Sequence, residues 1–287
     1  MTESPYRLAW RVTEPIHAMV YFVPEAAEAY ARAGVDDPNA GYFASRGAAF
    51  GACGPGIVSA TFYNFNPALV ARVLPAVWAS TTPAAMLAAR LEAAGAALTR
   101  GLGAEFVAGP EVAEAAALAR VAAEAAARWP QGRVLFAAHA ELTWPGEPHL
   151  VLFHAQMLLR EFRGDGHVAA LLAAEISGLE AIVLHVASGQ IDERFLRGSR
   201  GWSRDEWAAA ADVLRSRGLL EGDGLTEKGQ QLRATIEERT DRLAEPAYRV
   251  LGEENCLRLA ELTRAMSRTL VKAGFLDPRQ LASRRAV

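Results

Sequence analysis

The chain has 287 residues, of which 51% are hydrophobic and 22% are charged. These shares are ordinary for a globular protein and exclude a fibrous or largely disordered chain. The formal net charge of −3 gives the chain as a whole no electrostatic attraction to nucleic acid or to an anionic membrane.

The two cysteines, Cys53 and Cys256, are far apart and lack the spacing of a metal-binding motif. We therefore expect two buried thiols in a reducing compartment. The first residues show no basic region followed by an apolar run, and no uncharged apolar run reaches about 18 residues. The sequence thus predicts a cytoplasmic protein without a membrane-spanning segment.

Residues 1–130 are expected to form an N-terminal helical domain. Apolar residues recur at helical spacing, and several prolines stand where a first helical turn tolerates them. The apolar stretch 57–63 fits a strand or a buried helix by composition, and we favour a helix. The expected helices cover 5–22, 24–33, 41–50, 57–63, 67–80, 83–101 and 110–129.

Residues 131–189 are expected to form a central helical segment that is rich in histidine and arginine and lines a pocket. A turn-rich link precedes a helix over 149–162, and Gly164, Asp165 and Gly166 suggest a turn before a second helix that starts at His167. Ser177 and Glu180 have the spacing of a capping box, in which each side chain satisfies a free backbone donor. This box predicts a short buried helix.

Residues 190–287 carry the clearest local pattern. Ser203 and Glu206 form a second capping box, Gly218 ends that helix, and 219–226 reads as two short strands around a Gly-Asp-Gly turn. Two long helices, over 226–245 and 253–272, follow and suit a homodimer. This succession of elements, a helix, a turn, a second helix, a hairpin and a long helix, is typical of a winged helix-turn-helix.

In this order, residues 190–245 resemble the MarR-like winged-helix regulators. The whole chain, from EPIH through FRGDGH to TDRL, also resembles an actinobacterial helix-turn-helix family of unassigned activity. These resemblances imply a mainly α-helical fold with a winged helix-turn-helix and one small β-hairpin wing. They imply no mechanism.

An internal duplication is an open possibility. Residues 41–64 align without a gap on residues 166–189, and both stretches read as a helix, a turn of small residues and a buried apolar segment. A true repeat would make the chain a pseudo-dimer of two winged-helix-like halves, the first without a wing, with a natural pocket between them.

Histidines and acidic residues suggest a metal or haem site. Glu14 and His17 are three residues apart on one helix face, and His154 and Glu161 are seven apart, again on one face. We expect His167 to stay neutral in the first turn of its helix. The candidate metal ligands are Glu14, His17, His154, His167 and His185, and the candidate proton carriers are His154, His167 and Glu161. Each histidine alone is more often a hydrogen-bonded residue of the protein core; it is their number around one turn that suggests a site.

Arginines beside the same residues suggest an anchor for an anionic group. Guanidinium groups bind carboxylate or phosphate by two-point contacts, which makes Arg160 and Arg163 candidates, with Asp165 beside them. The same arginines could instead pair with acidic neighbours and lock the expected turn. Tyr21 and Tyr63 are expected to wall the pocket.

No nucleophile elbow, phosphate loop, dinucleotide fingerprint or HExxH motif is present, which argues against those enzyme classes. Our leading hypothesis is a small-molecule-, metal- or haem-binding protein, with enzymatic activity left open, on a repurposed winged-helix scaffold. The alternative is a ligand-responsive regulator that binds DNA through Arg200, Trp202 and Arg204. Asp205 and Glu206 weaken that alternative because they have the wrong sign for phosphates. An interaction module without chemistry is the third possibility.

Overall fold

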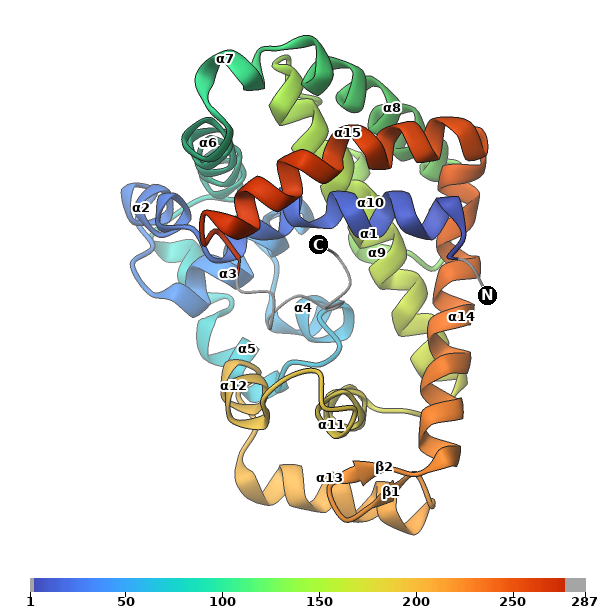
Figure 1. The fold of residues 1–287 in the computed structure, drawn as a ribbon. Coiled ribbons are helices and arrows are strands. Elements are labelled where there is room, and N and C mark those ends of the chain that lie inside the picture. Colours follow the sequence, from blue (N-terminus) through green and yellow to red (C-terminus); the bar gives the residue numbers. More distant parts are fainter. Residues whose placement is uncertain (1–2, 277–287) are drawn as a thin grey trace.

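The computed structural model describes residues 3–276, and this part of the chain is built almost entirely from helices (Figure 1). The first half contains α1 (Pro5–Ala18), η1 (Met19–Tyr21), α2 (Pro24–Arg32), α3 (Pro38–Gly47), η2 (Ala48–Phe50), α4 (Pro55–Thr61), α5 (Pro67–Val73), η3 (Ala76–Ala79), α6 (Pro83–Leu102), α7 (Ala104–Val107) and α8 (Pro110–Ala126). The expected helix at 57–63 is confirmed as α4.

The second half contains α9 (Val134–Ala140), α10 (Pro148–Ala173), α11 (Gly178–Ala187), α12 (Glu193–Ser199), α13 (Arg204–Ser216), β1 (Leu220–Glu221), β2 (Gly224–Leu225), α14 (Glu227–Arg249) and α15 (Gly252–Lys272). Among the described residues, β1 and β2 form a two-stranded antiparallel sheet in which Leu220 pairs with Leu225. The prediction of a mainly α-helical protein with one small β-hairpin is therefore confirmed.

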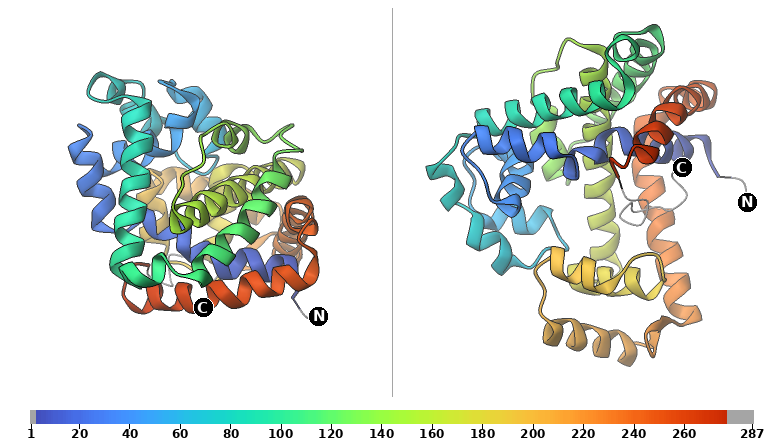
Figure 2. Two further views of the ribbon diagram at one scale, coloured as in Figure 1. Left: turned by 90° about the horizontal axis from the view of Figure 1, so that it is seen from above. Right: turned by 60° about the vertical axis from the view of Figure 1, so that its left-hand side comes forward.

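Two long helices join the upper body of the molecule to a smaller unit below it (Figures 1 and 2). Helix α10 packs on α8, α9 and α14, while α1 lies along α15 and crosses α10. A large apolar core fills the upper body, and a second core unites the end of α10 with α11, α12, α13 and part of α14. Residues of α10 and α14 contribute to both cores, so these helices fix the lower unit to the body.

The lower unit has the element order of a winged helix-turn-helix. Helices α12 and α13 are joined by a short turn, and β1 and β2 follow as the wing. The two capping boxes are confirmed: Ser177 accepts from the Glu180 amide and Ser203 from the Glu206 amide, and both glutamates return the contact. These caps explain why the starts of α11 and α13 could be predicted from four residues each.

The expected turn at Gly164, Asp165 and Gly166 is wrong, because α10 continues through all three residues. Glycine inside a helix costs about 1 kcal/mol relative to alanine, so these residues need another reason. A Cβ atom on Gly166 would come within 3.0 Å of Nη1 of Arg133. The carboxylate of Asp165 accepts a hydrogen bond from the Phe136 amide at 2.9 Å, near the start of α9. These positions therefore serve close packing and a helix cap.

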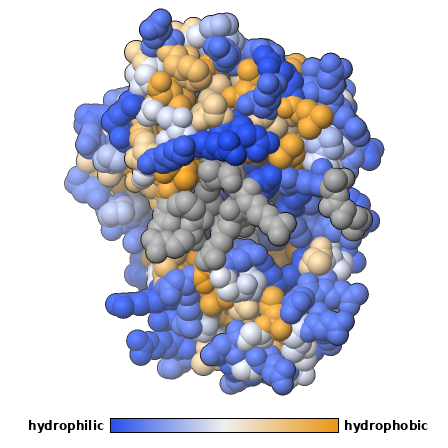
Figure 3. Space-filling view, viewed as in Figure 1, coloured by the Kyte–Doolittle hydropathy of each residue, from blue (hydrophilic) through white to orange (hydrophobic). Residues whose placement is uncertain are grey.

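Hydrophobic side chains reach the surface on both the upper body and the lower unit on the face shown in Figure 3. Exposed examples are Phe106, Val121 and Leu257. Within residues 3–276, no single helix is long and apolar enough to cross a membrane; α10 and α11 pass that test only as a pair bent by 95°.

Candidate functional site

Six of the residues that the sequence suggested meet in one place, and the sixth is Arg200 at the end of α12. Glu14, His17 and Tyr21 come from α1 and η1, and Arg160 and Glu161 come from α10. They lie around side chains of α3 and α6. We call this set the arginine–tyrosine cluster; its members are Glu14, His17, Tyr21, Tyr42, Arg46, Arg90, Arg160, Glu161 and Arg200.

The ion pair between Arg46 and Glu161 forms the floor of the cluster. Nη2 of Arg46 lies 2.8 Å from both carboxylate oxygens of Glu161, and these side chains are only 9% and 4% exposed. Nη1 of Arg46 donates to the Tyr42 hydroxyl at 2.7 Å. Burial raises the pKa of Glu161, but Arg46 and Arg160 outweigh it and lower that pKa to about 2. Glu161 is therefore a fixed negative charge.

Arg90 holds His17 in one neutral form. Nη2 of Arg90 donates to the Tyr21 hydroxyl at 3.0 Å and lies 3.1 Å from Nε2 of His17. A guanidinium group has only donors, so Nε2 accepts and the proton of the neutral ring is on Nδ1. Burial, followed by the charges of Arg160 and Arg90, holds the pKa of His17 well below its ordinary value. The ring is therefore a neutral donor.

Arg160 lies nearer the surface. Its Nε donates to Glu14 at 2.8 Å, and its side chain is 30% exposed. Its guanidinium carbon is 5.3 Å from the centre of the Tyr21 ring. Burial raises the pKa of Glu14 although Arg160 opposes this effect. Tyr21, Tyr42 and Arg160 are all half-buried, so they form the reachable side of the cluster.

The winged helix-turn-helix supplies the last member, Arg200, at the end of α12. Its guanidinium carbon is 4.5 Å from the centre of the Phe65 ring. Burial raises the pKa of Tyr42, but the charges of Arg46, Arg200 and Arg160 outweigh it, and the pKa falls below its ordinary value. The Tyr42 hydroxyl is therefore more acidic than an ordinary phenol.

The cluster has more positive than negative charge. Four arginines, Arg46, Arg90, Arg160 and Arg200, face two carboxylates, Glu14 and Glu161. In residues 3–276, the buried atoms without a hydrogen-bond partner include Nε of Arg46, Arg90 and Arg200 and Nδ1 of His17. Buried donors without partners are costly, and a surplus of buried positive charge is costlier. The arrangement can therefore hold an anion.

A short segment, residues 62–66, connects the cluster to the helix-turn-helix. The Phe62 ring lies 4.2 Å below the Arg46 guanidinium carbon. Trp202 donates from its indole nitrogen to the Asn64 carbonyl at 2.9 Å, and the Asn66 amide donates to the Arg200 carbonyl at 2.9 Å. The Asn66 side chain donates to Glu206 at 3.2 Å. The turn before α13 is therefore held against the body of the protein.

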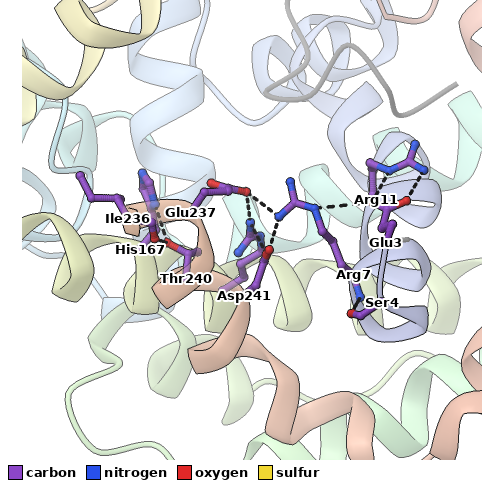
Figure 4. A network of polar contacts seen from close by, with 10 residues as sticks. Glu3, Ser4, Arg7, Arg11, His167, Ile236, Glu237, Thr240 and Asp241 are labelled. Carbon is purple, nitrogen blue, oxygen red and sulfur yellow. Dashed lines mark hydrogen bonds and ion pairs between the residues drawn. The ribbon is translucent and has the colours of Figure 1, made fainter. Parts of the chain in front are cut away.

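The other predicted anchors lie elsewhere. Arg163 shares Glu237 and Asp241 of α14 with Arg7 of α1, and Figure 4 shows this network linking the two helices. Asp165 caps α9, as described above, and burial raises its pKa to about 6. The Tyr63 hydroxyl donates to the Ile176 carbonyl at 2.7 Å. These contacts hold separate segments of the chain together.

The predicted metal ligands are not gathered. His154 lies against the Trp144 ring, with ring centres 4.6 Å apart, and burial lowers its pKa to about 4. His167 is in the middle of α10, where Nδ1 lies 2.9 Å from the Thr240 hydroxyl, so the argument from a first helical turn does not apply to it. His185 lies in α11. In the described part of the chain, no three His, Cys, Asp or Glu side chains are placed to hold a metal ion. The described residues therefore do not form the predicted metal site.

The first turn of α13 is acidic. Arg204, Asp205 and Glu206 are all exposed there, and Glu206 is occupied by the capping box and Asn66. Further along, Arg215 is paired with Asp212 at 2.6 Å and lies 3.7 Å from Asp223 of the wing. The face that a recognition helix would present to DNA is therefore poor in free positive charge.

Three cluster residues were not among the predicted site residues: Tyr42, Arg46 and Arg90. A signal for them exists. Tyr42 and Arg46 are four residues apart, hence on one helix face, and Arg90 is one of three charged residues in a helix that is otherwise rich in alanine and leucine. Arg90 is only 2% exposed and Arg46 only 7%. Arginines placed within mainly apolar helices are the sequence feature that could have marked this site.

The model of a helix-turn-helix family matches residues 6–277, which is nearly the whole chain. Comparisons with curated proteins and with solved structures give no match.

Proposed function

The chain belongs to this helix-turn-helix family, and from that premise we propose that it binds a small, doubly charged anion in the arginine–tyrosine cluster. In this proposal the winged helix-turn-helix acts mainly as a scaffold. It closes the site through Arg200. The observation that carries the proposal is the charge imbalance of four arginines against two carboxylates.

The charge surplus defines the ligand class. Two uncompensated guanidinium groups match two negative charges, as on a dicarboxylate or a phosphate monoester. Guanidinium groups bind both classes through charge-assisted hydrogen bonds. Nε of Arg200 and Nδ1 of His17 lack partners within residues 3–276 and would donate to such a ligand. The half-buried Tyr21 and Tyr42 would contact its less polar part.

Proton transfer to or from the ligand is within reach of this site. Tyr42 has a lowered pKa, and His17 is neutral with one free donor. Groups with shifted pKa values that lie together are typical of catalytic sites. If the ligand is a substrate, we expect Tyr42 to be the residue that exchanges a proton with it.

A DNA-binding regulator is the second candidate, and the family match is the observation that favours it. The resemblance of residues 190–245 to MarR-like regulators belongs to this candidate. The acidic first turn of α13 and its contacts with residues 62–66 argue against it. The anion site predicts that replacing Arg200 weakens anion binding. The regulator predicts that replacing Arg204 weakens DNA binding.

The test uses calorimetric titration of the full chain with inorganic phosphate, phenyl phosphate and succinate, and with phenol as an uncharged probe. We expect at least one dianion to bind. Arg200→Gln should weaken that binding roughly tenfold to a hundredfold, because a charged hydrogen bond contributes about 1.5 to 3 kcal/mol. Arg200 has no ion-pair partner within residues 3–276, so its loss strands no carboxylate.

The matched control is Arg204→Gln, which removes an exposed arginine outside the cluster. It should leave anion binding unchanged. Fluorescence polarisation with duplex DNA at two salt concentrations completes the comparison. No binding of any dianion, together with duplex binding that Arg204→Gln weakens, would refute the anion site and support the regulator.

A further inference from the structure

A groove beside the wing is separate from the arginine–tyrosine cluster. It has a volume of about 420 Å³ and lies between the end of α10, the start of β1 and one side of α14. Its apolar lining includes Ala173, Ala174, Leu219, Leu232 and Ile236. The preceding residue of α10, Leu172, is 61% exposed. Apolar surface that is open to solvent in this way is typical of binding surfaces.

The charged residues of this groove have one sign. Arg217, Lys228 and Arg239 line it, and no carboxylate is among its described lining residues. Arg217 donates to the Glu175 carbonyl at 2.9 Å and pairs with Glu180 at 3.5 Å, so its charge is already partly matched. Lys228 donates to the Arg217 carbonyl at 2.7 Å and is the cation at the end nearest the wing. Arg239 is exposed and, within residues 3–276, has no ion-pair partner.

The lining residues of α14 lie on one helix face. Lys228, Leu232, Thr235 and Arg239 follow one another at intervals of three or four residues. Lys228 and Arg239 are therefore about 16 Å apart along the helix axis. The groove offers a cation at each end with apolar side chains between them.

We infer that this wing-side groove binds an acidic amphipathic helix of a partner protein. Helices bind in grooves through apolar side chains at helical spacing, and acidic residues at the two ends of such a helix would meet Lys228 and Arg239. A fatty acid has one charged end, whereas this groove has cations at both ends. DNA is disfavoured because Glu221 and Asp223 on the adjacent wing would face its phosphates.

The experiment measures fluorescence anisotropy of a labelled peptide of about 15 residues, enough for about four helical turns. The peptide has leucines along one face and glutamates at both ends. A control peptide has lysine in place of each glutamate. We expect the acidic peptide to bind the full-length protein and the lysine peptide to bind at least about tenfold more weakly.

The decisive variant is Lys228→Glu/Arg239→Glu, and the matched control is Arg242→Glu on the same helix but outside the groove. We expect the double variant to lose peptide binding and the control to keep it. Circular dichroism and the thermal midpoint establish that both variants are folded. Their binding of the dianion in the arginine–tyrosine cluster should be unchanged.

Three outcomes would overturn the inference. The peptides could bind equally well or not at all. Decanoate could bind in the groove while the acidic peptide does not, which would make the groove a lipid site. The molar mass by light scattering could fall in the double variant, which would make a second copy of this chain the occupant. None of these outcomes bears on the dianion site.

Discussion

Replacement of Glu161 by glutamine tests the electrostatics of the arginine–tyrosine cluster directly. The Glu161 carboxylate accepts two contacts of 2.8 Å from Arg46, and its pKa is about 2 where 4.5 is ordinary. A difference of this size corresponds to about 3 kcal/mol of interaction that favours the carboxylate. We therefore expect Glu161→Gln to lower the free energy of unfolding by about 3 kcal/mol at neutral pH.

The sign of the pH dependence follows from the lowered pKa. The stabilisation by Glu161 is fully present above the pKa of the unfolded chain, near 4.5, and is lost as pH falls toward about 2. The difference in stability between wild type and Glu161→Gln should therefore shrink over this interval. Other carboxylates titrate in both proteins, so taking the difference isolates Glu161.

The assay is urea unfolding followed by circular dichroism at a series of pH values. Glu92→Gln is the matched control, because Glu92 pairs with Arg32 at 2.7 Å but both side chains are about 60% exposed. Such surface pairs contribute about 0.2 to 1 kcal/mol. If Glu161→Gln proved as stable as Glu92→Gln, or if its deficit did not change with pH, the reasoning on the cluster would be wrong.

Three further predictions address the phenol, the wing and a buried histidine. In the ultraviolet difference spectrum between wild type and Tyr42→Phe, the tyrosinate of Tyr42 should form at a lower pH than the ordinary pKa of 10 predicts. A bound dianion should raise the pKa of Tyr42. Asp212→Asn/Asp223→Asn should free Arg215 and steepen the salt dependence of duplex binding by about one phosphate contact; unchanged polarisation curves would exclude the wing as a DNA contact. Burial lowers the pKa of His154 from 6.5 to about 4, so the unfolded chain takes up this proton first as the pH falls. The free energy of unfolding should therefore decrease by about 1.4 kcal/mol for each pH unit between 6.5 and about 4. His154→Gln should reduce this decrease in urea unfolding.

The parts of the fold that could be predicted depend on local chemistry. The capping boxes at Ser177 and Ser203 and the hairpin around Gly222 and Asp223 are each determined by a few neighbouring residues. The continuity of α10 depends instead on what Asp165 and Gly166 contact in α9 and beside Leu243. The sequence around these two residues contains no sign of those contacts, so the turn was the reasonable prediction and the wrong one.

Some residues of the candidate site could be predicted from the sequence, but their shared chemistry could not. Glu14, His17 and Arg160 were singled out because charged and polar residues stood among apolar ones, and they do meet. A metal site was inferred for Glu14 and His17 and an anchor for an anionic group for Arg160. The sequence did not unite them in one site, because the other arginines that surround them come from distant parts of the chain. Arg46 and Glu161, for example, are 115 residues apart. Pairing at this distance in sequence is fixed by the fold, and no local pattern reveals it.

The segment 62–66 joins the two functional hypotheses. Its phenylalanines lie under Arg46 and Arg200 of the cluster, while Asn64 and Asn66 hold the turn before α13. Gly178 of α11 packs so closely on this segment that a Cβ atom would come within 1.8 Å of the Tyr63 carbonyl oxygen. An anion that draws Arg46 and Arg200 together would therefore press on the same residues that position α13. Anion binding and any DNA binding should consequently be coupled. The affinity for each ligand should therefore change when it is measured in the presence of the other.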